Sequence, residues 1–137
     1  MNMQSAPPPP RDATDLKGQR GLLRLVRALG YSRDGLAAAW LHEDAFRQEA
    51  VLAVLMIPLA LWLPVGLVEK ILLVGVVVLV LIVELLNTAV EAAIDRHGPE
   101  LNPLAKRAKD YGSAAVLLAL LLAGGTWVAI LAARFLG

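Results

Sequence analysis

An uncharged run from Ile71 to Val83 is followed by four polar side chains at helical spacing. These side chains belong to Glu84, Asn87, Glu91 and Asp95. At about 100° per residue they fall within an arc of about 80°, so a helix here has one narrow polar face and is otherwise apolar. A carboxylate in an apolar helix of membrane-spanning length is costly, and it usually has a partner or a function. The pattern therefore predicts either a helix-packing face held by ion pairs or a site for cations at a membrane boundary.

The composition favours a membrane protein. Hydrophobic residues make up 58% of the 137 residues, and aromatic residues only 5%. Mean hydropathy is +0.63, and the length suits one domain. The net charge of +1 argues against a nucleic-acid-binding protein, because no strongly basic surface is implied. The chain has no cysteine, which excludes disulfides and thiolate metal sites.

Hydropathy predicts an all-α chain with three transmembrane helices over about 45–63, 68–95 and 108–135. The third helix begins at Asn102-Pro103, an N-cap followed by proline, so its first two turns project from the lipid. The three tryptophans are interpreted as anchors at the membrane interface. They are Trp40, Trp62 and Trp127.

Residues 1–19 contain a proline run and scattered charges, and we expect a disordered tail before a membrane domain over 20–137. An amphipathic helix over about 21–30 has the pattern of a surface helix lying in the membrane interface. Gly30-Tyr31-Ser32 is expected to break this helix. A further helix over 36–50 is expected to approach the bilayer.

Lysine and arginine gather before the first predicted span and around the loop between the second and third. The other loop has only Lys70, and the C-terminal end only Arg134. The positive-inside rule therefore predicts a cytoplasmic N-terminus and an external C-terminus. The carboxylates of the second span then lie in its cytoplasmic half, on the side where ATP is available.

Oxygen ligands and the absence of cysteine favour Mg²⁺ over zinc. Glu43, before the first span, is a plausible partner for Glu84 and Glu91. Two acidic groups plus nucleotide phosphates are an ordinary way to hold Mg²⁺. Lys109 and Asp110 are expected at the depth of the lower second span, as a nucleotide contact or an interfacial charge pair.

Glu84 lies deepest among the acidic groups, where it is placed to take the proton of an interfacial hydroxyl. The chain has no P-loop motif and no protein-kinase motif set. A nucleotide site in this chain would therefore be built from membrane helices.

Four blocks of sequence, in order, resemble the prokaryotic diacylglycerol kinase family of small membrane enzymes. The longest runs from Glu84 to Arg96 (ELLNTAVEAAIDR), and another runs from Ala105 to Val116 (AKRAKDYGSAAV). The others are Ala38-Ala39-Trp40 with Glu43, and Ala45 to Glu49 (AFRQE). The likeness covers about residues 24–135 and leaves the proline-rich tail outside.

The resemblance implies a homotrimer in the bacterial inner membrane, with three spans and a surface helix per subunit. Its activity would be transfer of the γ-phosphoryl of MgATP to diacylglycerol, giving phosphatidic acid. By position, Glu84 resembles the general base, Glu43 and Glu91 the Mg²⁺ ligands, and Asn87 a supporting polar residue. The implied ATP contacts are Arg24, Tyr31, Glu43, Glu91, Glu100, Asn102, Lys109 and Asp110. The implied lipid-substrate positions are Trp40, Ala45, Phe46, Arg47, Gln48, Glu49 and Ser113.

This sequence departs from the enterobacterial pattern at three positions. Asn102 stands where the enterobacterial enzyme has histidine, while Arg33 and Ala37 replace a tryptophan and an arginine. These changes concern an ATP contact and the lipid-entry surface. None affects the acidic residues.

Three alternatives to this activity remain at the level of sequence. An undecaprenol kinase is the close rival within the family. A small ion or proton transport subunit would use Glu84 and Glu91 as a relay, and it would not need Lys109-Asp110. A structural membrane subunit would carry four aligned polar groups at a cost and without use.

Overall fold

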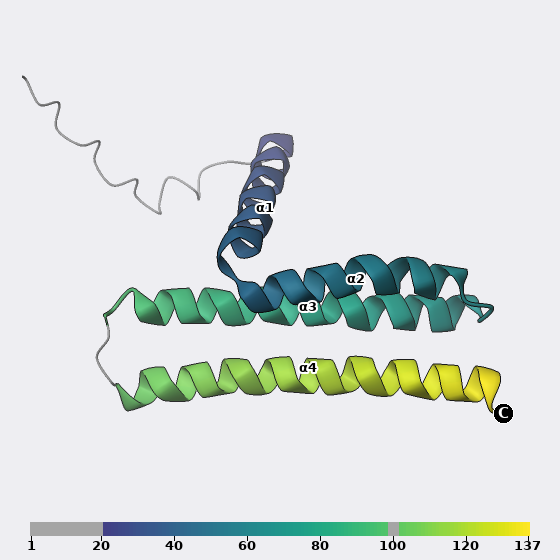
Figure 1. Cartoon of the computed structure of the whole chain (residues 1–137). Helices are drawn as coiled ribbons and strands as arrows, with labels where there is room; N and C mark the ends of the chain where they lie inside the picture. The colour runs from purple at the N-terminus through teal and green to yellow at the C-terminus, as the bar shows by residue number, and fades with distance from the viewer. Residues whose placement is uncertain (1–20, 99–101) are drawn as a thin grey trace, which may run out of the picture. The chain divides into compact units, whose positions relative to one another are not determined.

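The computed structural model describes residues 21–98 and 102–137, and all four elements in them are helices (Figure 1). Their bounds are α1 Leu22–His42, α2 Asp44–Trp62, α3 Leu67–Asp95 and α4 Pro103–Phe135. The last three are long and apolar enough to cross a bilayer. They confirm the prediction of an all-α chain with three such helices. The proposed disordered tail lies outside the described residues.

Helix α1 is longer than the predicted surface helix, because it runs through Gly30-Tyr31-Ser32 and ends at His42. The Ser32 hydroxyl donates to the Ala28 carbonyl at 2.9 Å, so this polar side chain is satisfied inside the helix. The predicted break at Gly30 is therefore wrong. The chain divides after Leu36 into two units, and α1 contributes residues to both.

The break between α1 and α2 lies at Glu43, whose backbone is extended. The Arg47 guanidinium donates to the carbonyls of Trp40 and Leu41, at 2.9 and 3.1 Å, and also pairs with Asp44. A cation on the last carbonyls of a helix satisfies groups that have no intrahelical partner. Arg47 thus holds the end of α1 against the start of α2.

Helix α3 is the central element of the second unit and packs against both α2 and α4. Figure 1 shows it running beside each of them. Its buried side chains recur every three or four residues along one face: Leu73, Val76, Val77, Val80 and Glu84. Many large apolar side chains of α2 and α4 are nevertheless exposed, as expected for surfaces that face lipid or another subunit.

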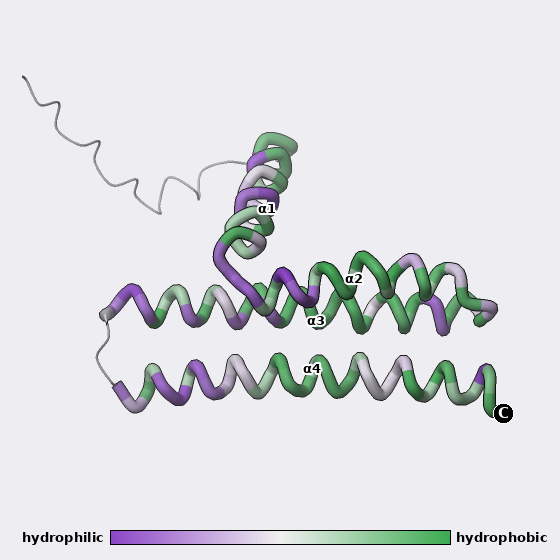
Figure 2. The backbone as a smooth tube through the Cα atoms, in the orientation of Figure 1, coloured by the Kyte–Doolittle hydropathy of each residue, from purple (hydrophilic) through white to green (hydrophobic). Residues whose placement is uncertain are grey.

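The polar residues of this unit are concentrated where α3 ends and α4 begins, and at the start of α2 (Figure 2). Helices α3 and α4 contain 29 and 33 residues. At about 1.5 Å per residue both exceed a hydrocarbon core of about 30 Å, so their ends extend beyond it. Asn102 caps α4 as predicted, since its side-chain carbonyl accepts from the Leu104 amide at 2.8 Å.

Trp127 is only 6% exposed and lies in the core, which contradicts its interpretation as an interface anchor. Its indole N–H donates to the Leu73 carbonyl at 3.2 Å and joins α4 to α3. Trp62, in contrast, is 80% exposed at the end of α2.

Replacing Trp127 with phenylalanine is expected to lower the free energy of unfolding by about 1 kcal/mol, because a hydrogen bond between membrane helices is lost. Reversible unfolding in mixed micelles measures this change. Trp62→Phe serves as the matched control and should change the free energy by less than about 0.5 kcal/mol. Equal effects of the two substitutions would contradict a structural role for the indole N–H.

Candidate functional site

The polar face of α3 changes from buried to exposed along the helix. Glu84 is 5% exposed and is the only buried charged side chain among the described residues. Asn87 and Glu91 are half-buried, and Asp95 is exposed. Asn87 Nδ2 donates to Glu91 Oε1 at 3.5 Å. Exposure of the predicted polar face thus increases toward the end of α3, and its first carboxylate, Glu84, is buried among the helices.

Carboxylates from α2 and its N-cap lie near this face. The carboxylates of Glu43 and Glu91 lie near enough to Glu84 to repel its negative charge. Glu84 has the same effect on Glu49. Glu43 is the N-cap residue of α2, but its side chain makes no capping hydrogen bond. Of these carboxylates only Glu84 is buried, and a buried carboxylate is costly unless it is paired or hydrogen-bonded.

Two ion pairs lie at the end of α3 and the start of α4. Lys109 Nζ bonds Asp95 Oδ1 at 2.6 Å, and Lys106 Nζ bonds Asp110 Oδ2 at 2.6 Å. The Lys109 charge also interacts with Glu91. Lys109 therefore lies at the depth of the lower α3 face, as predicted. It does not pair with Asp110, because each of these residues has its own partner.

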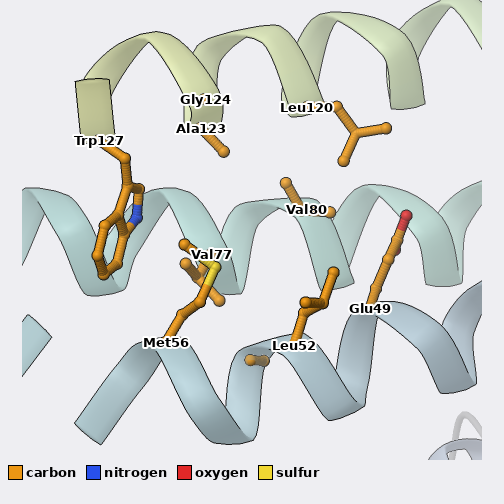
Figure 3. A pocket seen from close by; sticks show the side chains of 10 residues that line it. Glu49, Leu52, Met56, Val77, Val80, Leu120, Ala123, Gly124 and Trp127 are labelled. Atoms are coloured by element: carbon orange, nitrogen blue, oxygen red, sulfur yellow. The ribbon is translucent and has the colours of Figure 1, made fainter. Parts of the chain in front are cut away.

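The structure contains a pocket of about 240 Å³ between α2, α3 and α4. Its wall is almost entirely apolar, and Glu49 stands at one end with Trp127 at the other (Figure 3). Glu49 Oε2 is buried and has no hydrogen-bond partner. An apolar slot with a carboxylate at one end suits a molecule with a hydrocarbon part and a polar part.

The lipid-substrate positions named from the sequence lie at the end of α1, at the start of α2 and on α4. Phe46 is 4% exposed and belongs to the core, while Trp40, Ala45 and Gln48 are exposed. Ser113 is exposed on α4. Of this set, only Glu49 lines the pocket.

Only some of the nucleotide-contact positions named from the sequence lie near one another in the structure. Arg24 and Tyr31 are exposed and belong to the first unit, whereas Lys109 and Asp110 belong to the second. Glu100 lies outside the described residues. The side-chain carbonyl of Asn102 caps α4. Its side-chain nitrogen, Nδ2, is therefore the group that could donate to a ligand.

A complete metal cage is absent from the described ranges 21–98 and 102–137, where no three His, Cys, Asp or Glu side chains are arranged around one point. The pair Glu43 and Glu91 has the chemistry for Mg²⁺ all the same. This ion usually binds one or two protein carboxylates and takes its other ligands from water and phosphate.

Sequence reasoning missed two contacts at this site. Asp95 is part of the predicted polar face, but its pairing with Lys109 depends on how α4 packs against α3. Gly112 lies directly against the Asn87 side chain, so that a Cβ at Gly112 would overlap Asn87 Oδ1. Small residues recur on one face of α4, at Gly112, Ala115, Ala119 and Ala123, and this pattern is typical of a close helix approach but does not identify the partner.

Comparisons with known proteins agree on one family. The family described as prokaryotic diacylglycerol kinase matches residues 30–131. A diacylglycerol kinase of Escherichia coli K12 is 50% identical over 115 residues, which cover 84% of this chain and 94% of the relative. The diacylglycerol kinase of Pseudomonas aeruginosa has the same identity and coverage. That of Haemophilus influenzae is 46% identical over 111 residues, covering 81% of this chain and 94% of the relative.

Proposed function

Because this chain belongs to the prokaryotic diacylglycerol kinase family, we propose that it phosphorylates diacylglycerol with MgATP at the membrane interface. The products are phosphatidic acid and ADP. The chain is an enzyme of that family. The observation that carries the proposal is the buried carboxylate Glu84, with acidic side chains of α2 and α3 within reach of its charge.

Phosphoryl transfer requires positioning and neutralisation of charge more than covalent catalysis. We assign Glu84 the role of general base, which takes the proton of the lipid hydroxyl as its oxygen attacks the γ-phosphorus. The bond from the γ-phosphorus to the bridging oxygen breaks, and the electron pair leaves with ADP. Burial of Glu84 supports this role, since a buried base is shielded from competing water.

Glu43 and Glu91 are the residues that would hold Mg²⁺, and Asn87 supports Glu91 through its side-chain amide. Bound Mg²⁺ supplies neutralisation of the phosphate charge. The free carboxylate of Glu43, which caps no helix, fits this assignment. The electrostatic influence of both carboxylates on Glu84 supports a base that works beside the phosphates.

The lipid acceptor fits the pocket between the three helices. An acyl chain would lie along its apolar wall, with the glycerol end toward Glu49 and Glu84. The buried and unpartnered Glu49 Oε2 is an acceptor for a glycerol hydroxyl. The other proposed lipid contacts stay as named from the sequence, at Trp40, the 45–49 stretch and Ser113.

The nucleotide is proposed to contact Lys109, Asp110 and Asn102 at the start of α4. Arg24, Tyr31 and Glu100 complete this set by resemblance. Lys109 now bonds Asp95, an exposed pair that is worth little in water. Its ammonium can therefore exchange this carboxylate for a phosphate at small cost.

We place the protein in the bacterial inner membrane, with its N-terminus and the α3–α4 loop in the cytoplasm, as the distribution of lysine and arginine favours. A homotrimer is the proposed assembly. The exposed apolar side chains of α2 and α4 leave surface for neighbouring subunits and lipid. At the interface, soluble ATP and bilayer-confined lipid can meet without either crossing.

Replacing Lys109 with methionine is expected to raise the Michaelis constant for ATP about tenfold, because one charge-assisted hydrogen bond to phosphate is lost. Steady-state kinetics at saturating lipid measures this constant. Lys70→Met is the matched control. Lys70 lies near the start of α3, far along the helix from the Asp95 end that Lys109 contacts, and it donates to the Leu61 carbonyl at 2.7 Å. An unchanged constant in Lys109→Met would remove this residue from the nucleotide site.

The test of the proposed acceptor is transfer of label from γ-labelled ATP by purified protein to two lipids, offered separately and together. Diacylglycerol is expected to be the better substrate by kcat/KM. Label in undecaprenol alone would make the chain an undecaprenol kinase. Label in neither lipid, with nucleotide still consumed, would overturn the proposal.

A further inference from the structure

Gly112 of α4 lies against the Asn87 side chain of α3 at the acidic face. The position that a Cβ at Gly112 would take overlaps Asn87 Oδ1 and lies 3.2 Å from Asn87 Cγ. The other two glycines of α4, Gly124 and Gly125, have nothing within 4 Å of that position. Of the three glycines in α4, only Gly112 is therefore in contact with a side chain of another helix.

The Asn87 side-chain amide has one end at this contact. Its Oδ1 is buried without a conventional hydrogen-bond partner. The hydrogen that glycine carries in place of Cβ points toward this oxygen, and such a Cα–H group is a weak donor. Oδ1 faces Gly112, and the amide nitrogen on the other side, Nδ2, donates to Glu91 Oε1 at 3.5 Å.

We infer that Gly112 is a positioning residue for the reaction: by having no side chain, it keeps the Asn87 amide where it orients the Glu91 carboxylate. This inference rests on the proposed function, in which Glu91 holds Mg²⁺. A group that hydrogen-bonds a metal ligand fixes the orientation of that ligand, and its loss commonly costs 10- to 100-fold in metal affinity.

Gly112→Ala separates this role from a purely structural one. The atom that an added Cβ meets is the far end of the Asn87 side chain, which can move aside without a backbone shift. Alanine is also the better helix former. The variant is therefore expected to fold, with its thermal unfolding temperature unchanged or raised, and only the Asn87–Glu91 contact should be lost.

The experiment uses the full-length protein in detergent micelles with Mn²⁺ as the probe ion and ATP present. Electron paramagnetic resonance measures how much Mn²⁺ is bound. For Gly112→Ala we expect the Mn²⁺ concentration that half-saturates the protein to rise at least about tenfold. The side-chain amide resonances of Asn87 should shift in the same variant. Gly125→Ala, in the same helix with open space around it, should change neither quantity.

A double-mutant cycle adds a test that does not depend on the size of one effect. Asn87→Ala should weaken Mn²⁺ binding about as much as Gly112→Ala, and the double variant no more than either, because both remove one contact. Additive effects would overturn the inference, as would unchanged Asn87 resonances in Gly112→Ala.

The two levels of the proposal fail in different ways. If the native chain binds Mn²⁺ with ATP and phosphorylates lipid, and Gly112→Ala does both equally well, only the positioning role of Gly112 is wrong. If the native chain binds no Mn²⁺ and phosphorylates no lipid, the proposed function has failed, and the inference fails with it.

Discussion

Glu84→Gln is expected to lower the turnover number for lipid phosphorylation by at least ~10²-fold, the usual scale for a general base. Glutamine keeps the size and shape of the side chain but cannot accept the hydroxyl proton. The same substitution removes the Glu84 charge, which is repelled by the carboxylates of Glu43 and Glu91 and acts in the same way on Glu49. Folding and subunit assembly should therefore survive it.

Two measurements on Glu84→Gln separate chemistry from binding. Single-turnover transfer of labelled phosphate to diacylglycerol reports the chemical step, and equilibrium binding of MgATP reports the nucleotide site. We expect the first to fall and the second to be unchanged. The control is Glu69→Gln, an exposed glutamate in the first turn of α3. Lost nucleotide binding with an intact rate of transfer would contradict the role as base.

Glu91→Gln is expected to abolish Mg²⁺-dependent consumption of ATP, a loss of about 10²-fold or more at millimolar Mg²⁺. The reason differs from that for Glu84. The charge stabilisation that a bound metal gives to a phosphoryl transfer amounts to several kcal/mol, and each 1.36 kcal/mol is a factor of ten in rate. Loss of a proposed ligand removes part of this stabilisation.

The concentration dependence on Mg²⁺ distinguishes the two glutamates. In Glu91→Gln the Mg²⁺ concentration for half-maximal rate should rise, whereas in Glu84→Gln it should stay at the native value. A native Mg²⁺ requirement in Glu91→Gln would remove this residue from the metal site. Native turnover in the same variant would also return the transport alternative to consideration, since the carboxylate would then serve another purpose.

The sequence predicted the helices that depend on hydropathy and capping. The bounds of α2 and α3 agree with the expected spans within one residue at each end, and α4 begins at Pro103 after the Asn102 cap. These features are local, because apolar length and an N-cap can be recognised without knowing what a helix packs against. The polar face of α3 was predicted for the same reason, since it follows from helical periodicity alone.

The errors arose where tertiary or local hydrogen bonds decide the outcome. Gly30-Tyr31-Ser32 has the composition of a break, but the Ser32 hydroxyl finds the Ala28 carbonyl within the helix. Trp127 has the character of an interface anchor, but its indole N–H finds the Leu73 carbonyl of α3. Neither partner can be identified from residue types, because each contact depends on a conformation or a packing that the pattern does not encode.

The candidate site divides in the same way. Glu84, Asn87 and Glu91 share a helix, so their proximity could be predicted. Three other features depend on how two helices pack: the burial of the Glu49 oxygen, the Lys109–Asp95 pair and the contact of Gly112 with Asn87. Pairings between helices depend on the register of packing, which a single sequence does not fix.

The most direct test is the stoichiometry of phosphatidic acid formed to ATP consumed by the purified protein in bicelles containing diacylglycerol. The proposed function predicts one phosphatidic acid per ATP, with neither appearing when diacylglycerol or Mg²⁺ is omitted. ATP consumption that continues without a lipid acceptor, with no labelled phosphate in the lipid fraction, would contradict it.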